Sequence, residues 1–212
     1  MVSKNIFAAL ALRLAIALSL FVAVYWQVND RMMHNLFRPA EYFSYFSITS
    51  SLLAGLILTL SSIQLVRGRA ETKLLSLSRL TMAVSMVIVG VIYNALLRGG
   101  DPDPRDANYD WPVIPNEIIH TYVPILILVE WLFTRTTIAL KLNQAFWVLV
   151  YPLSWLAFSI IRGIIQVWWP YWFIDPQYGL GTQVMWIFII AALFSVLSLG
   201  FLPAQRALAK RK

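Results

Sequence analysis

Six stretches of this chain are apolar over about 20 residues each, the length that an α-helix needs to cross a bilayer. Hydrophobic residues make up 59% of the 212 residues and charged residues only 13%, which is more apolar surface than one soluble core can bury. We therefore expect an all-α integral membrane protein, a single transmembrane domain over residues 1–212 folded as a bundle of six helices. The expected spans are 6–27, 42–66, 74–98, 114–134, 144–167 and 183–203.

Basic residues are distributed unevenly between the two ends of these spans. The end that carries both termini has the larger share: Lys4, Arg67, Arg69, Lys73, Arg135, Lys141, Arg206, Lys210, Arg211 and Lys212. The other end holds mainly Arg31, Arg38 and Arg105. The positive-inside rule then predicts cytoplasmic termini, with loops 28–41, 99–113 and 168–182 facing outward, across the inner membrane if the cell is bacterial. This placement also argues against nucleic-acid binding, despite the net charge of +7.

Ionisable side chains inside the spans are costly, so each needs a partner or a function. Arg13 and Glu130 are expected at similar depths near the cytoplasmic ends of spans one and four. We predict a buried pair that fixes helix packing, with Arg79 as a further candidate for burial. Arg162 lies near the outer end of span five, where it can hold an anionic group of a lipid.

His120 is the most informative of these residues. It lies in the segment PNEIIHTYVP, where Pro124 follows it by four positions. A proline there cannot donate to the carbonyl of residue 120, which loosens the helix at the histidine. Asn116 and Glu117 share the helix face of His120. Together these features favour a functional histidine over a merely packed one.

The hydroxyl-rich segment YFSYFSITSSLLAGL, residues 42–56, has two interpretations. On a helix, Ser44, Ser47, Ser51 and Gly55 form one stripe of small residues, which is typical of close helix packing in membranes. Ser47 is also expected at the depth of His120, and a hydroxyl and an imidazole at matched depth can form a nucleophile–base pair. Thr49 points about 200° away from Ser47 at 3.6 residues per turn. Both interpretations stay open, and they are compatible.

Four segments, in this order, resemble the androgen-induced-gene type of polytopic membrane hydrolase and its bacterial homologues. They are LRLAIALS in span one, SYFSITSSLL in span two, NEIIHTYVPILILVE in span four and WPYWFID before span six. The family hydrolyses fatty-acid esters of hydroxy fatty acids with a threonine–histidine dyad. The resemblance implies that His120 is the catalytic histidine and that a membrane lipid or fatty-acyl ester is the substrate. The family's threonine falls on Ser47, a departure from the pattern, and a shift of two residues would place Thr49 there; the helical stripe favours Ser47.

Further candidates bind substrate or stabilise charge during the reaction. Asn116, Tyr93 and Asn94 are possible donors to an oxyanion, and the carboxylate of a substrate can be held by Arg162 or by the segment that contains Trp169, Tyr171 and Asp175. No cofactor or metal site is expected, since the chain has no cysteine and two histidines in separate segments. The oligomeric state has no signal in the sequence. The alternatives are a non-catalytic lipid-binding protein and a small-solute or proton transporter.

Overall fold

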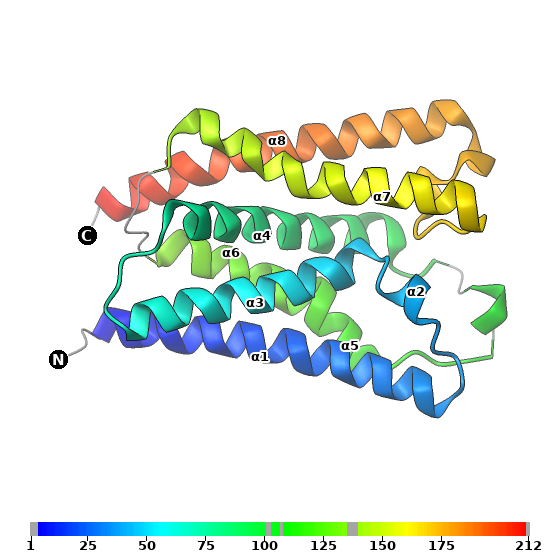
Figure 1. The fold of residues 1–212 in the computed structure, drawn as a ribbon, viewed down its shortest axis with the longest axis horizontal. Helices are drawn as coiled ribbons and strands as arrows, with labels where there is room; N and C mark the ends of the chain where they lie inside the picture. The colour runs from blue at the N-terminus through cyan, green and yellow to red at the C-terminus, as the bar shows by residue number, and fades with distance from the viewer. Residues whose placement is uncertain (1–3, 101–102, 107, 135–139, 211–212) are drawn as a thin grey trace.

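The structure is a computed structural model that describes residues 4–100, 103–106, 108–134 and 140–210 (Figure 1). Every regular element in these ranges is helical; η1 and η3 are π-helical turns and the other η segments are 3₁₀-helical. The elements are α1 (Lys4–Met33), α2 (Pro39–Tyr42), α3 (Phe46–Val66), α4 (Lys73–Ile92), η1 (Tyr93–Leu97), η2 (Pro104–Asp106), α5 (Val113–Glu117), η3 (Ile118–Tyr122), α6 (Val123–Phe133), η4 (Leu142–Leu149), α7 (Val150–Gln166), η5 (Trp172–Ile174), η6 (Pro176–Tyr178) and α8 (Leu180–Lys210).

Six helical segments in the described part of the chain are long and apolar enough to span a membrane, as predicted. They are Ile6–Met33, Phe46–Val66, Lys73–Leu97, Val113–Phe133, Leu142–Gln166 and Leu180–Ala204. The helix ends differ from the prediction most clearly in α1, α3 and α8, and α8 runs over Leu180–Lys210 where 183–203 was expected. The first helix continues past residue 27 to Met33, and the second begins at Phe46 because the preceding residues form α2 and a turn. Ser44 therefore lies before α3 and is not part of its stripe; its hydroxyl donates to the carbonyl of Ala40 at 2.6 Å.

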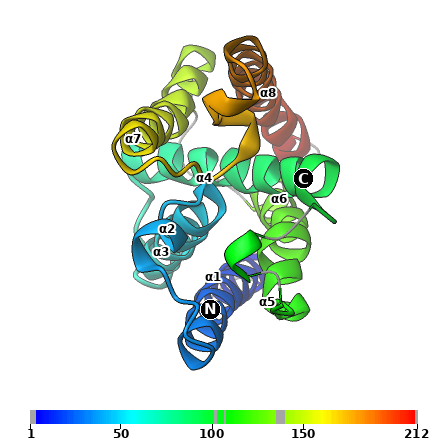
Figure 2. The same cartoon turned by 90° about the vertical axis from the view of Figure 1, so that its right-hand side faces the viewer.

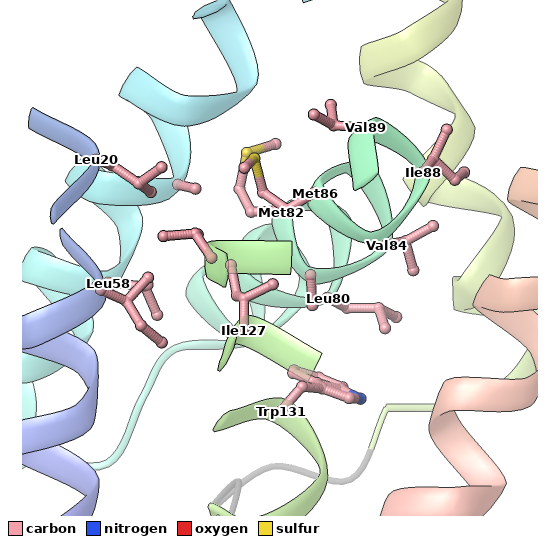
Figure 3. Close-up of a cluster of buried hydrophobic side chains, with 14 of the residues drawn as sticks. Leu20, Leu58, Leu80, Met82, Val84, Met86, Ile88, Val89, Ile127 and Trp131 are labelled. Atoms are coloured by element: carbon pink, nitrogen blue, oxygen red, sulfur yellow. The ribbon is translucent and has the colours of Figure 1, made fainter. Parts of the chain in front are cut away.

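Helix α4 lies at the centre of the bundle. It packs against α3, α6 and α8, and α1 packs against α3 and α6. Figure 2 shows α7 and α8 on the side of α4 away from α1. The core follows this arrangement: Leu80, Val84 and Met86 of α4 are completely buried, and Figure 3 shows them between neighbouring helices. Both termini lie at one end of the bundle, called here the terminal end, and the connections around α2, η2 and η5 form the opposite loop end (Figure 1).

Four charged side chains meet inside the bundle toward the terminal end. The predicted pair is present, with Nε of Arg13 on α1 lying 2.6 Å from Oε1 of Glu130 on α6. Arg79 of α4 contacts the same oxygen of Glu130 and lies 3.0 Å from Oε1 of Glu71. All four side chains are at most 7% exposed, and their formal charges cancel. Glu71 was missed in the sequence because it lies between spans, where a charge needs no buried partner.

Candidate active site

An apolar cavity lies toward the loop end, between α3, α4, α7, α8 and the turn η5. Its empty volume is about 800 Å³ with its opening to solvent included. The walls are mainly aliphatic and aromatic, with Ile88 from α4, Leu153 from α7 and Phe194 from α8 among them. Residues with polar side-chain atoms also line it: Ser47, Tyr93, His120, Trp155 and Tyr171. Ser47 and His120, predicted at matched depth, thus line one cavity.

The backbone around His120 is set by Pro124 and by a close helix contact. Residues Ile118–Tyr122 form a π-helical turn, a distortion that recurs at functional sites. The side-chain amide of Asn94 donates to the carbonyl oxygen of His120 at 3.0 Å and to that of Gly90 at 2.8 Å. A side chain at Gly90 would meet Pro124 at 2.7 Å, so α4 and α6 approach closely only because residue 90 is glycine. Asn94 therefore supports the backbone of His120 instead of facing the cavity with its amide.

The imidazole of His120 is held in one tautomer. Its Nδ1 lies 2.9 Å from the carbonyl oxygen of Asn116, which can only accept, so Nδ1 carries the proton. Nε2 then keeps its lone pair, as a general base requires. The ring stacks on Tyr93 with centroids 4.2 Å apart and an interplanar angle of 28°. The side-chain amide of Asn116 donates to the hydroxyl of Tyr93 at 2.6 Å, which fixes that ring as well.

Ser47 is the second residue of α3, and its side chain lies at the edge of the cavity. The residue is 8% exposed. Its backbone N–H donates to the hydroxyl of Tyr171 at 3.4 Å, and its carbonyl accepts from the hydroxyl of Ser51 at 2.7 Å. The first turn of α3 is thereby tied to the turn η5, which is remote in the sequence.

Thr49 lies elsewhere on the same helix. Its hydroxyl donates to the carbonyl of Phe46 and is 3.0 Å from the hydroxyl of Tyr151 on α7, which Ser50 also contacts at 3.0 Å. Thr49 does not line the cavity that holds His120. The geometry therefore favours Ser47 over Thr49 as the partner of His120.

A second cavity opens beside the first at the loop end. Its empty volume is about 1160 Å³ with its opening included, and Tyr93 and Leu97 line both cavities. We call this second cavity the vestibule. It is more polar than the first cavity, and it is lined by charged side chains of the loop end that the sequence did not single out as a group: Arg31, Arg38, Glu41, Asp103 and Asp106. In the sequence, the alternating charges of the segment DPRD, residues 103–106, were the signal that could have indicated this group of charged residues.

An ion network closes the rim of the vestibule. Arg38 donates to both carboxylate oxygens of Asp106, at 2.9 and 2.7 Å, and to Glu41 at 3.0 Å. Arg105 donates to both oxygens of Glu41, at 2.9 and 2.8 Å, and also pairs with Asp103. Two bidentate arginines therefore hold the 103–106 segment against α2.

This network predicts a loosening of the rim in acid. The hydrogen bond from Arg105 is the main cause that lowers the pKa of Asp103 to about 2. At Glu41 burial acts to raise the pKa, and the hydrogen bonds from Arg105 and Arg38 outweigh it, so that pKa is lowered too. A carboxyl group whose pKa is lower in the folded state contributes stability above its unfolded pKa of about 4 and loses it as the pH falls toward the folded value.

We expect hydrogen-exchange protection of the backbone N–H groups of Arg105 and Asp106, corrected for the intrinsic rate, to be constant from about pH 7 to 5 and to fall between about pH 4 and 2. Amides of α4 in the core serve as the control and are expected to stay protected. Constant protection of the rim through this window would contradict the assignment of the network.

Besides Asn94, three predicted substrate-binding residues line neither cavity: Arg162, Trp169 and Asp175. The guanidinium of Arg162 stacks over Trp168 at 4.5 Å, and Trp169 packs against the backbone of α7. Asp175 caps η6 by accepting from the backbone N–H of Gln177 at 2.9 Å. Tyr171, from the same region as Trp169 and Asp175, does line the first cavity.

Comparisons of the chain with protein-family models, with curated proteins and with solved structures give no match. The resemblance to the androgen-induced-gene type of hydrolase therefore rests on the four sequence segments alone.

Proposed function

We propose that this protein is an integral membrane lipid ester hydrolase in which Ser47 is the nucleophile and His120 the general base. One observation carries the proposal: a serine and a histidine with an available Nε2 line the same mainly apolar cavity. A cavity with mainly aliphatic and aromatic walls suits an acyl chain, and the reactive pair lies where an ester group can reach it.

The reaction follows from these positions. The Oγ of Ser47 attacks the ester carbonyl carbon and passes its proton to Nε2 of His120, while the carbonyl π electrons move onto the oxygen. When the carbonyl re-forms, the ester C–O bond breaks and the leaving alkoxide takes the proton from His120. Water then attacks the acyl-serine with the same base, which releases the acid and restores Ser47.

The two cavities suggest how the substrate lies. We propose that an acyl chain occupies the apolar cavity and that the polar end of the lipid faces the vestibule, past Tyr93. The vestibule also supplies the water for the second step. The charge asymmetry would orient the vestibule outward and both termini toward the cytoplasm. By resemblance, a fatty-acid ester of a hydroxy fatty acid is the first substrate to test.

A non-catalytic lipid-binding protein is the second candidate. No hydrogen bond joins Ser47 to His120 in the described residues, so a catalytic pair has to tighten when substrate binds, as catalytic contacts in empty enzymes often do. A transporter is less well supported, because Arg13 and Glu130 belong to a neutral packed cluster and line neither cavity.

Intact-mass labelling with an alkyl fluorophosphonate separates these candidates. We expect one covalent adduct on the detergent-purified protein and none on Ser47→Ala, because the serine oxygen is the atom that is phosphonylated. Thr49→Ala is the matched control, since it removes a hydroxyl from the same helix outside the cavity, and it is expected to label like the wild type. An adduct that persists in Ser47→Ala and disappears in Thr49→Ala would move the nucleophile to Thr49. Lipid binding without any adduct would favour the non-catalytic candidate.

A further inference from the structure

The turn η5 brings the hydroxyl of Tyr171 to the first turn of α3. The ring of Tyr171 lies parallel to Phe173, with centroids 5.0 Å apart and an interplanar angle of 6°, and it meets Tyr45 edge-on at 5.7 Å. These contacts fix the ring. Its hydroxyl accepts from the backbone N–H of Ser47 at 3.4 Å, and both residues line the apolar cavity.

The backbone N–H of Ser47 is a donor that makes only a long hydrogen-bond contact. The first N–H groups of an α-helix have no partner within the helix. In α3, the N–H groups of Ile48 and Thr49 turn back to the carbonyl of Tyr45, at 3.2 and 3.1 Å. The N–H of Ser47 makes instead the 3.4 Å contact with Tyr171, longer than a normal N–H···O hydrogen bond. Its place at the start of a 21-residue helix also favours a negative charge there.

We propose that the backbone N–H of Ser47 and the hydroxyl of Tyr171 together form the oxyanion hole of the hydrolase. This inference rests on the proposed function and adds a catalytic residue to it. Two donor atoms 3.4 Å apart can both reach a third oxygen at about 2.7–3.1 Å, the distance at which oxyanion donors act. The carbonyl oxygen of the ester would enter between them, replacing their long mutual contact with two shorter hydrogen bonds.

Of the donors considered from the sequence, the two amides are committed elsewhere. The amide of Asn94 serves two backbone carbonyls, and the amide of Asn116 donates to the hydroxyl of Tyr93. A tyrosine phenol is protonated at neutral pH, and burial raises the pKa of the Tyr171 phenol further above that range. The phenol therefore keeps its proton at neutral pH and donates a hydrogen bond, while the proton that moves in the reaction travels between Ser47 and His120.

The test is Tyr171→Phe, which removes one oxygen and keeps the stacked ring. We expect kcat for ester hydrolysis to fall about 10²-fold with KM nearly unchanged, since the donor acts on charge that develops in the transition state. Affinity for an alkyl boronic acid, which forms a tetrahedral adduct with the serine, is expected to fall in parallel. Tyr151→Phe is the matched control: it removes a hydroxyl that contacts α3 outside the cavity, and its kcat is expected to stay within about twofold of wild type.

The outcomes are distinguishable. Wild-type kcat and boronate affinity in Tyr171→Phe would overturn the role of Tyr171 and leave the hydrolase proposal standing. A wild-type protein that neither forms an adduct nor hydrolyses esters would overturn both. If Tyr171→Phe lost its cooperative unfolding transition, 3-fluorotyrosine inserted at position 171 would replace it, because fluorine makes the phenol a stronger donor without removing it. A kcat that is unchanged on fluorination would then count against the assignment.

Discussion

Hydrolysis of a lipid ester by His120→Ala is expected to be about 10²–10⁴-fold slower than by the wild type, the usual contribution of a positioned general base. The reason is geometric. The carbonyl oxygen of Asn116 accepts from Nδ1–H of His120, and the side chain of Asn94 bonds the backbone carbonyl of the same residue. The imidazole is therefore fixed in an orientation in which Nε2 keeps its lone pair. The measurement is kcat in detergent or reconstituted vesicles, with binding of a non-hydrolysable ether analogue followed separately.

The chain offers a matched control, because His34 is its other histidine. His34 lies past the end of α1 with its side chain 52% exposed, and its Nδ1 contacts the carbonyl of Asp30 at 2.8 Å. His34→Ala is expected to hydrolyse the ester at the wild-type rate. A wild-type rate in His120→Ala, with ether-analogue binding intact, would remove the general base from the proposed mechanism.

The spans were predictable from hydropathy because a bilayer leaves a chain few choices. Backbone groups in hydrocarbon must be bonded within a helix, and the required length is fixed by membrane thickness. The end of α1 was not predictable in this way. Residues beyond 27 are polar enough to read as a loop, yet the helix continues because tertiary contacts hold it: Tyr42 donates to the side chain of Gln27 at 2.9 Å, and Arg31 stacks on Trp111 at 3.9 Å.

For the candidate site, the sequence predicts the depth of the residues along the bundle but not which side chains meet. Sequence position places Ser47 and His120 at similar heights, but the rotation of each helix and the course of the loops decide which side chains meet. Thus Tyr171 approaches Ser47 from a turn more than a hundred residues away. Arg162, expected near the outer end of span five, stacks over Trp168 and lines neither cavity. For aromatic residues near a membrane interface, the sequence predicts the depth in the membrane, whereas packing decides the direction of the side chain.

Removing the carboxylate at position 130 is expected to be the most destabilising single change among the charged residues discussed. Glu130→Ala should lower the free energy of unfolding by about 3–5 kcal/mol, the usual cost of breaking a buried ion pair from one side. Oε1 of Glu130 accepts from Arg13, Arg79 and Thr134, so its loss leaves two buried guanidinium groups that, among the ion pairs of the described residues, share Glu71 as their remaining counter-ion. The measurement is reversible unfolding in mixed micelles.

Glu117→Ala is the control on the same membrane span. Glu117 pairs with Arg98, which is 45% exposed, at 2.8 Å, and exposed pairs contribute about 0–1 kcal/mol. Equal unfolding free energies for the two variants would show that the buried cluster does not hold the terminal end together. The two largest predictions also separate the parts of the molecule: His120→Ala should remove turnover from a stable protein, whereas Glu130→Ala should weaken a protein whose cavity at the other end is unaltered. If Glu130→Ala abolished turnover at temperatures where it is still folded, the two ends would be coupled and the cluster would have a part in the reaction.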